Sequence, residues 1–349
     1  GVVAIGQAGE KLVKFSMAYV DRIATLGRGG FGAVMGSKNL KAIVARGTRG
    51  VSVADRKGYK TLKKTIFERM RAYPHLKEWQ EMGLINSFPF VEKETYLHIK
   101  KRRVACVSCP IGCKDVVEIR EGDLKGQVVC SSSAINLFTP IIYGMKDYRE
   151  AIKLIADLDE YGLDMFEFMG LMVFAKTLSE QGLIPRDRAE PKIEVESLGS
   201  MEAWAGKIAR REGLGDVLAD GFPGAIEAFG EKAEALAPAL VKGMHPYAGP
   251  GAALPWHLFG SMELGQVLDP RGPHVGSSGS PTYFARRPLE VFPKHLDRMG
   301  VPEDEIEGIL PRGDKGEIAG LKVGALLRHS HRWFAILGAL GVGARAGVR

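Results

Sequence analysis

Three of the chain's four cysteines, Cys106, Cys109 and Cys113, lie close together in the spacing C-x2-C-x3-C. Pro110 and Gly112 bend the backbone between them, so that the thiols can converge. An iron–sulfur cubane needs convergent thiolates because each corner iron takes one of them. Structural zinc is the alternative, but zinc sites usually show two C-x2-C pairs about a dozen or more residues apart. The spacing therefore favours an iron–sulfur cluster in a reducing compartment over a disulfide framework.

A glycine-rich run at residues 27–38 could bind an anionic group. Gly29 and Gly30 let the backbone approach a ligand and direct N–H groups at its oxygens. Arg28 adds a bidentate guanidinium and Lys38 a point charge. The run matches neither a P-loop nor a dinucleotide fingerprint, and a tight structural turn is the alternative interpretation.

Two carboxylates, Asp159 and Asp164, bracket Gly162 and Leu163 at the predicted end of a helix. Such a pair could accept hydrogen bonds from a polar heterocycle, and a solvated helix end is the alternative. His274 stands in a run rich in glycine and proline, where a side chain can be held against a buried site. We therefore take His274 as the candidate catalytic residue, with a structural histidine as the alternative.

The bulk composition limits the class of protein. A chain of 349 residues with 45% hydrophobic residues has room for two or three domains, and no apolar run is long enough to span a bilayer. The net charge of +7 suits an anionic ligand or an acidic protein partner. The basic run at residues 100–103 could serve docking near the cysteines, but it lacks interleaved aromatics, so we expect no nucleic-acid binding. The chain opens like the interior of a strand, so we expect a segment of a longer, cytoplasmic protein.

The elements that position these residues can be read from periodicity and caps. Strands are predicted at 2–5 and 42–45, a helix or strand at 18–28, and a helix from Asp55 to Arg71. An alternating segment follows the cysteines, and Asp147 begins a helix that Gly162 ends. Further helices are predicted at 165–180, 201–211, 216–229 and 318–337. Residues 243–282 show no periodicity, as is typical of functional segments.

Three of these features together resemble one enzyme family. Residues 27–44 closely resemble the end of the N-terminal domain of aldehyde:ferredoxin oxidoreductases. The cysteine group resembles the cubane ligands of that family, and residues 159–164 resemble its pterin-binding D-x-x-G-L-D motif. The similarity runs through nearly the whole chain in the family's order.

The resemblance implies both a fold and an activity. The family binds tungsten, sometimes molybdenum, as a bis-pterin complex beside a 4Fe-4S cluster, and it interconverts aldehydes and carboxylic acids with low-potential ferredoxin. The implied fold is mostly α, with two helical domains at 51–205 and 206–349 after the end of a β-rich pterin-binding domain at 1–50. The implied partners are ferredoxin or an iron–sulfur partner subunit and a small aldehyde or acyl substrate, and the chain could form a homo-oligomer.

The resemblance also implies roles for individual residues. The cofactor-binding residues would be Arg28, Gly29, Gly30, Lys38, Asp159, Gly162, Leu163 and Asp164. Cys106, Cys109 and Cys113 would ligate the cluster, and His274 corresponds in position to a histidine near the metal in some members.

The sequence departs from the family at two places. The second motif, D-x-x-G-L-C, has Gly338 and Gly343 at its aspartate and cysteine positions, so the fourth cluster thiolate is lost, is replaced by Cys130, or the cluster is incomplete. The E-x-x-H motif, which binds a bridging iron in some members, is replaced by Lys153 and Ala156.

Cys130 bears on the branch of the family. It resembles a metal-ligating cysteine in the tungsten subunit of class II benzoyl-CoA reductases. Cys130 would ligate the cluster, ligate tungsten or pack in the core, since a soft thiolate suits either metal. Aldehyde oxidation is the predicted reaction. The alternatives are a subunit of an aromatic acyl-CoA reductase, a non-catalytic scaffold, and a zinc-stabilised module.

Overall fold

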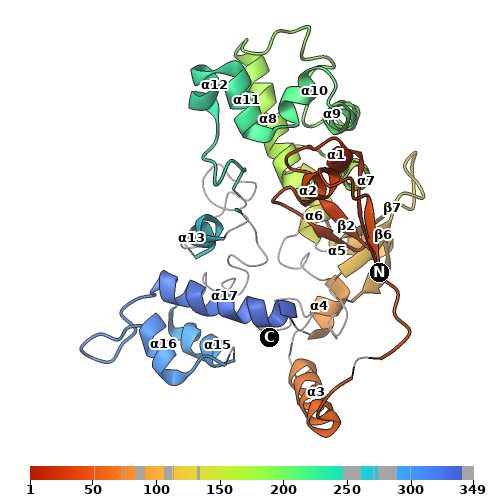
Figure 1. The fold of residues 1–349 in the computed structure, drawn as a ribbon. Helices are drawn as coiled ribbons and strands as arrows, with labels where there is room; N and C mark the ends of the chain where they lie inside the picture. Colours follow the sequence, from red (N-terminus) through yellow and green to blue (C-terminus); the bar gives the residue numbers. More distant parts are fainter. Residues whose placement is uncertain are drawn as a thin grey trace. The chain divides into compact units, whose positions relative to one another are not determined.

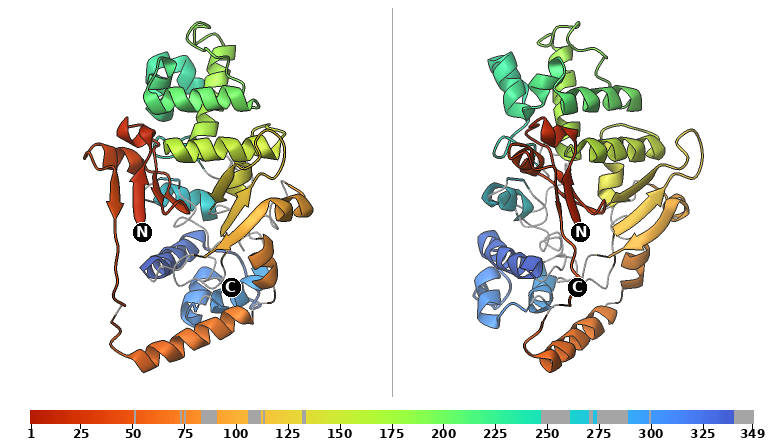
Figure 2. Two further views of the ribbon diagram at one scale, coloured as in Figure 1. Left: turned by 90° about the vertical axis from the view of Figure 1, so that its right-hand side faces the viewer. Right: turned by 45° about the vertical axis from the view of Figure 1, so that its right-hand side comes forward.

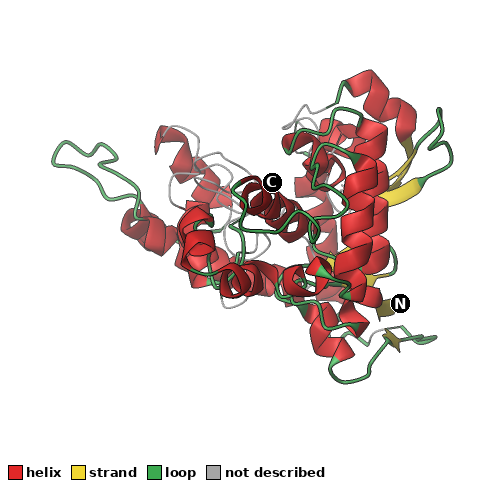
Figure 3. Cartoon of the chain, turned by 90° about the horizontal axis from the view of Figure 1, so that it is seen from above, coloured by secondary structure: helices red, strands yellow, loops and turns green. Residues whose placement is uncertain are grey.

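The computed structural model describes residues 1–50, 52–72, 74, 76–82, 91–105, 112, 114–131, 134–246, 261–269, 272–273, 289–298 and 300–339. Helices dominate its regular structure, which confirms the mostly α prediction (Figure 3). The chain divides into two compact units, the first made of Gly1–Ala105 and the described residues 112–237, the second beginning at Pro238. The domain limits near residues 50 and 205 stay predictions.

A four-stranded antiparallel sheet opens the first unit and lies in the red part of the ribbon around β2 in Figure 1. Its strand order is β3-β2-β1-β4. Its strands are β1 (Val2–Ile5), β2 (Ala18–Val20), β3 (Ala24–Leu26) and β4 (Ala42–Val44). The strands predicted at 2–5 and 42–45 are confirmed, and the ambiguous segment 18–28 forms a hairpin of two strands. Helices α1 (Gln7–Glu10) and α2 (Phe31–Gly36) accompany the sheet, and Met35 of α2 packs on Ile5 and Ala18.

A three-stranded antiparallel sheet flanks the cysteine motif. Its strands β5 (Lys100–Val104), β6 (Lys114–Glu118) and β7 (Val128–Ser131) lie in that order. Val104 pairs with Lys114, so the two ends of the intervening segment are held side by side. Cys106, Cys109 and Cys113 themselves lie outside the described residues. Cys130 is opposite Val116, two residues farther along β6 than Lys114.

The basic run before the cysteines is partly neutralised within this sheet. Lys100 lies 2.8 Å from Asp115, and Lys101 lies 3.1 Å from Glu118. The Asp115 carboxylate also accepts a hydrogen bond from the buried Tyr96 hydroxyl. Half of the run therefore stabilises the sheet, and a docking role for it stays a prediction.

Helices form the rest of the first unit (Figure 2). They are α3 (Arg56–Arg71), α4 (Leu76–Met82), α5 (Lys93–Ile99), α6 (Ala134–Ile142), α7 (Tyr148–Tyr161), α8 (Met165–Glu180), α9 (Leu198–Arg210), α10 (Leu214–Leu218), α11 (Gly221–Phe229) and α12 (Glu231–Leu236). Asp147 caps α7 as predicted, accepting a hydrogen bond from the Arg149 amide. The predicted apolar face of α7, with Ile152, Ile155 and Leu158, is buried.

The predicted helix 216–229 is interrupted. Gly221 has a φ of +72°, a left-handed conformation that separates α10 from α11. Pro223 then falls in the first turn of α11, where its missing amide hydrogen is not needed. The glycine and proline were both visible in the sequence, but the apolar periodicity on either side outweighed them.

The second unit contains α13 (Ser261–Leu268), the 3-10 helix η3 (Leu289–Val291), α15 (Phe292–Arg298), α16 (Glu303–Ile309) and α17 (Val323–Ala339). Its core joins the last three helices through Phe292, Leu296, Ile309 and Leu326. Helix α17 starts later than predicted because Ile318 forms a β-bridge with Arg312. Helix α13 lies inside the segment that lacked periodicity. In the described part of the chain, no helix combines the length and apolar composition needed to cross a bilayer.

Candidate functional site

The D-x-x-G-L-D loop joins the first sheet to the helices. Helix α7 ends at Gly162, which is left-handed (φ 76°, ψ 38°), and α8 begins directly after Asp164. The Met17 amide donates a hydrogen bond to the Gly162 carbonyl (2.8 Å), and the Asp164 amide donates to the Phe15 carbonyl (3.1 Å). The loop is therefore fixed to the N-terminal segment by backbone hydrogen bonds.

The end of β1 touches the end of α7 at two glycines. A Cβ on Gly6 would collide with the Tyr161 carbonyl, and one on Gly162 would lie 3.1 Å from the Gly6 nitrogen. A larger residue at either position would push the sheet away from the helix. This close approach places Asp159, one turn before the end of α7, beside the strands.

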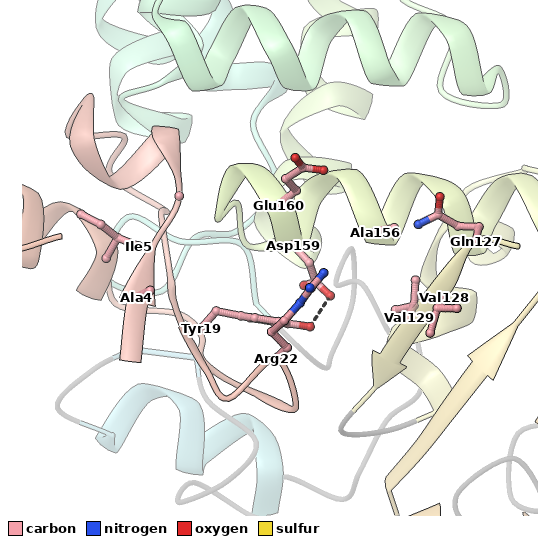
Figure 4. A pocket seen from close by; sticks show the side chains of 11 residues that line it. Ala4, Ile5, Tyr19, Arg22, Gln127, Val128, Val129, Ala156, Asp159 and Glu160 are labelled. Atoms are coloured by element: carbon pink, nitrogen blue, oxygen red, sulfur yellow. Dashed lines mark hydrogen bonds between the residues drawn. The ribbon is translucent and has the colours of Figure 1, made fainter. Parts of the chain in front are cut away.

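A pocket of about 360 Å³ lies where β1, β2, β7 and α7 meet (Figure 4). It is lined by Ala4, Ile5, Gly6, Tyr19, Arg22, Gln127, Val128, Val129, Ala156, Asp159 and Glu160. Its size falls within the usual range of small-molecule sites. Four elements remote in sequence thus line one pocket with both apolar and polar residues.

Asp159 is the polar centre of this pocket. Its Oδ2 accepts a hydrogen bond of 2.8 Å from the Tyr19 hydroxyl, and the two side chains point toward one another (Figure 4). Burial raises the pKa of Asp159 to about 7, although the Tyr19 hydrogen bond acts in the lowering direction. The carboxyl can therefore hold or release a proton near neutral pH. Glu160 points away from this pair, and Arg22 is among the residues that line the pocket (Figure 4).

Asp164 lies in different surroundings, with Arg28 and Glu167. Arg28 Nη2 lies 3.1 Å from Glu167 Oε2, and its Nε lies 3.7 Å from Asp164 Oδ1. Asp164 also caps α8 by accepting a hydrogen bond of 2.9 Å from the Glu167 amide. All three side chains are buried, so one guanidinium offsets two carboxylates away from water.

A tyrosine that the sequence did not single out lies beside this cluster. The Tyr143 hydroxyl is buried and has no hydrogen-bond partner within the described residues. Burial raises the pKa of Tyr143 well above its usual value, and nearby Arg28 opposes that shift. A buried hydroxyl without a partner is costly, which is consistent with a polar ligand group at this place.

The other predicted residues are placed as follows. Gly29 and Gly30 have left-handed backbones, and Gly30 begins α2. Lys38 is exposed just beyond α2, and the Leu163 side chain is fully buried in the core. The structure brings Arg28 and Asp164 together, whereas Asp159 lines the pocket. His274 lies outside the described residues, as do the three clustered cysteines.

Lys153 stands where the family's E-x-x-H motif would have its first iron ligand, and it forms ion pairs instead. Lys153 Nζ lies 2.5 Å from Asp157 on its own helix and 2.9 Å from Glu202 on α9. The lysine thereby joins α7 to α9 by charge, where the resemblance would place a metal ligand.

Comparison with known proteins identifies related sequences. The family model for the aldehyde ferredoxin oxidoreductase N-terminal domain matches residues 1–47, and the model for domains 2 and 3 matches residues 42–310. A tungsten-containing aldehyde ferredoxin oxidoreductase of Pyrococcus horikoshii is 31% identical over 249 residues, 63% of this chain and 40% of that protein. The WOR-like subunit of an aliphatic sulfonate oxidoreductase of Pyrococcus furiosus is 24% identical over 253 residues, 63% of this chain and 39% of that protein.

A solved structure has the same fold. The active-site complex of a benzoyl-coenzyme A reductase with 1,5-dienoyl-CoA matches with a TM-score of 0.74 and 22% identity, over 98% of this chain and 57% of that one. The chain spans about two fifths of the length of the curated relatives that it matches.

Proposed function

Since this chain belongs to the aldehyde ferredoxin oxidoreductase family, we propose that it is part of a tungsten–bispterin oxidoreductase that converts an aldehyde to a carboxylic acid. The observation that carries this proposal is the position of Asp159, which faces the pocket from the D-x-x-G-L-D motif. Molybdenum in place of tungsten would leave the roles of the protein residues unchanged.

The pocket residues fit a pterin. Its ring system presents amino and ring N–H donors, and the pocket offers the Asp159 carboxyl and the Gln127 amide as acceptors. Val128, Val129 and Ala156 also line the pocket, and their apolar side chains suit contact with a flat heterocycle. Outside the pocket, near Arg28, the Tyr143 hydroxyl, which has no hydrogen-bond partner among the described residues, would offer a further donor.

The chain's own residues would bind, orient and hold protons. Asp159, with its pKa near 7, would accept hydrogen bonds when ionised and keep a proton at its carboxyl when not. Tyr19 orients that carboxyl, and Arg28 with Asp164 fixes the loop that carries it. When bound, the metal–pterin complex supplies the two-electron redox chemistry.

Electrons would leave through a 4Fe-4S cluster on Cys106, Cys109 and Cys113 to a ferredoxin-like acceptor. The described structure supports this in one respect, because the pairing of Val104 with Lys114 closes the segment that carries all three cysteines into a loop. His274 is proposed as the residue near the metal. These four assignments rest on the family motifs.

One observation favours a second reaction, the reduction of an aromatic acyl-CoA. Val128 and Val129 of β7 line the pocket that Asp159 faces, and Cys130 follows them directly. Since Cys130 also resembles a metal-ligating cysteine of class II benzoyl-CoA reductases, this place in the chain supports a role as a tungsten ligand as well as one as a fourth cluster ligand. The chain would then be the active-site subunit of a larger complex with an iron–sulfur partner.

Metal and pterin analysis of the full-length protein, purified without oxygen, tests the proposal. The expected result is tungsten or molybdenum with pterin, and iron and sulfide for a cubane. Iron without tungsten, molybdenum and pterin would favour a non-catalytic scaffold, and zinc alone would favour a zinc-stabilised module. Aldehyde oxidation with a viologen dye, set against reduction of an aromatic CoA ester, then separates the two reactions.

A further inference from the structure

Helix α3 carries a stripe of apolar side chains on its exposed surface. Tyr59, Leu62 and Ile66 are 52%, 60% and 45% exposed, and their spacing of three and four residues places them in one row. Met70 continues the row and is buried at the end of the helix, where Phe67 and Leu76 line an adjoining hollow. The stripe is therefore buried at one end and open along the rest.

A basic face lies beside the stripe. Lys60, Lys63, Lys64 and Arg71 lie on the side of the helix next to the stripe. With Phe67 and Glu68 they line a shallow hollow of about 330 Å³. The helix contains seven basic residues and one acidic residue, Glu68. Glu68 is 3.8 Å from Lys64, so it offsets little of this charge.

Such a helix gains little stability from its own sequence. An isolated helix of this length is marginal in water, and its like charges at a spacing of four residues destabilise it further. Most helical stability in proteins comes from packing of an apolar face, yet this apolar face is uncovered over three of its four positions. A partner that covered the stripe and carried negative charge would bury the apolar side chains and offset the repulsion between the basic ones.

We propose that α3 is the docking surface for an acidic protein, which covers the Tyr59–Leu62–Ile66 stripe with an apolar patch and pairs carboxylates with the adjacent lysines. The charge of the helix is what identifies the partner, because complementary charge steers association and rejects basic proteins. Resting on the proposed function, the partner is an acidic iron–sulfur electron carrier. An anionic membrane is less suited, since the exposed stripe is short and contains no tryptophan.

Binding of an oxidised acidic ferredoxin to the full-length protein tests this proposal. Replacing Lys60, Lys63 and Lys64 together by Glu should weaken binding by about tenfold or more at about 50 mM salt, and by much less at about 500 mM. The matched control replaces the exposed Lys125, Lys146 and Lys232 by Glu, which makes the same charge change elsewhere in the first unit. The control should bind within about twofold of wild type.

A second variant tests the apolar part. Leu62→Ser with Ile66→Ser should weaken binding at both salt concentrations, because burial of apolar surface is not screened. Both side chains are exposed, so the melting temperature and the viologen-linked activity of this variant should match wild type. Unchanged ferredoxin affinity in both α3 variants would overturn the proposal.

Three other outcomes would also overturn it. The first is that wild type forms a dimer that the α3 variants lose, which would mean that a second copy of the chain covers the stripe. The second is that α3 binds phosphatidylserine vesicles in preference to ferredoxin. The third is that, in the full-length protein without ferredoxin, other segments of the same chain protect α3 from hydrogen exchange. Metal analysis of the same preparations keeps the two proposals separate. Ferredoxin binding that depends on α3 in a protein without tungsten or pterin would contradict the proposed reaction and leave the docking surface standing.

Discussion

Asp159 and Asp164 bracket the same glycine turn, and their surroundings differ in every respect that matters for chemistry. Asp164 is buried, caps α8 and lies beside Arg28. Asp159 faces an open pocket, has the Tyr19 hydroxyl as its hydrogen-bond partner, and has its pKa raised to about 7.

The difference shows how one short motif can serve two purposes. A carboxylate that caps a helix and contacts a buried guanidinium is committed to the fold, and a ligand could reach it only by breaking those contacts. A carboxylate held at a pocket wall keeps unused acceptor sites. In this chain, therefore, Asp164 stabilises the loop, and the proposed contact with a cofactor falls to Asp159.

Removal of Arg28 should have the largest effect on stability. Arg28→Met leaves Asp164 and Glu167 buried without their cation, so we expect a loss of about 3–5 kcal/mol near pH 7 in urea unfolding. Arg22→Met, at an exposed arginine of the pocket, should cost less than about 0.5 kcal/mol. Equal losses in the two variants would mean that the Arg28 cluster does not hold the loop.

Variants of Asp164 separate its two structural roles. Asp164→Ala should cost about 1–3 kcal/mol, since the cap and the contact with Arg28 are both lost. Asp164→Asn keeps an oxygen for the Glu167 amide and should recover the part due to the cap, about 1 kcal/mol. Thermal unfolding of the two variants measures this difference, and no difference between them would refute the capping role.

Asp159→Asn should increase the stability of the protein, whereas the Arg28 and Asp164 variants decrease it. The folded protein keeps the Asp159 proton up to about pH 7, whereas the unfolded chain releases it near 4, so the carboxyl weakens the fold progressively as the pH rises between these values. We expect Asp159→Asn to stabilise the protein by about 1–2 kcal/mol at about pH 8 and to have little effect at about pH 4. The gain at about pH 8 is smaller than the pKa shift alone would imply, because solvent screens the charge at this partly exposed site. Unfolding curves at the two pH values test this, and a loss of stability at the higher pH would contradict it.

The smallest effect is expected from Tyr19→Phe. Loss of one hydrogen bond should cost about 0.5–1.5 kcal/mol, and the pKa of Asp159 should rise further because that bond favours the ionised form. Carboxyl chemical shifts followed through a pH titration would report the change. Tyr59→Phe, on the exposed face of α3, serves as the control and should leave that pKa unchanged.

Local signals were enough to predict much of the framework. Helix α8 occupies the predicted residues 165–180, the cap at Asp147 and the stop at Gly162 are where expected, and β1 matches its prediction. Each depends on residues within about one helical turn or on a period of two or 3.6.

The partners within the site could not be predicted in the same way. Tyr19 meets Asp159, and Arg28 meets Glu167, across about 140 residues of sequence. No periodicity or cap encodes such pairings, which follow from the close approach of β1 to α7 at Gly6 and Gly162. Tyr143 and Gln127 gave no signal at all, because a single polar residue in an apolar or loop segment has no fixed direction. The roles of Cys106, Cys109 and Cys113 as cluster ligands, and of Cys130 as a ligand of the cluster or of tungsten or as a core residue, stay predictions.

The pterin content of Asp159→Ala tests the central claim most directly, since that claim is that Asp159 faces the cofactor while Asp164 holds the fold. Full-length wild type, Asp159→Ala and Asp164→Asn would be purified without oxygen, and pterin, tungsten and iron per chain measured beside the melting temperature. We predict that Asp159→Ala retains its iron yet loses most of its pterin and tungsten, and that it melts no lower than cofactor-free wild type. Asp164→Asn should keep more cofactor and, compared without cofactor, be less stable than wild type. Wild-type pterin content in Asp159→Ala would contradict the account.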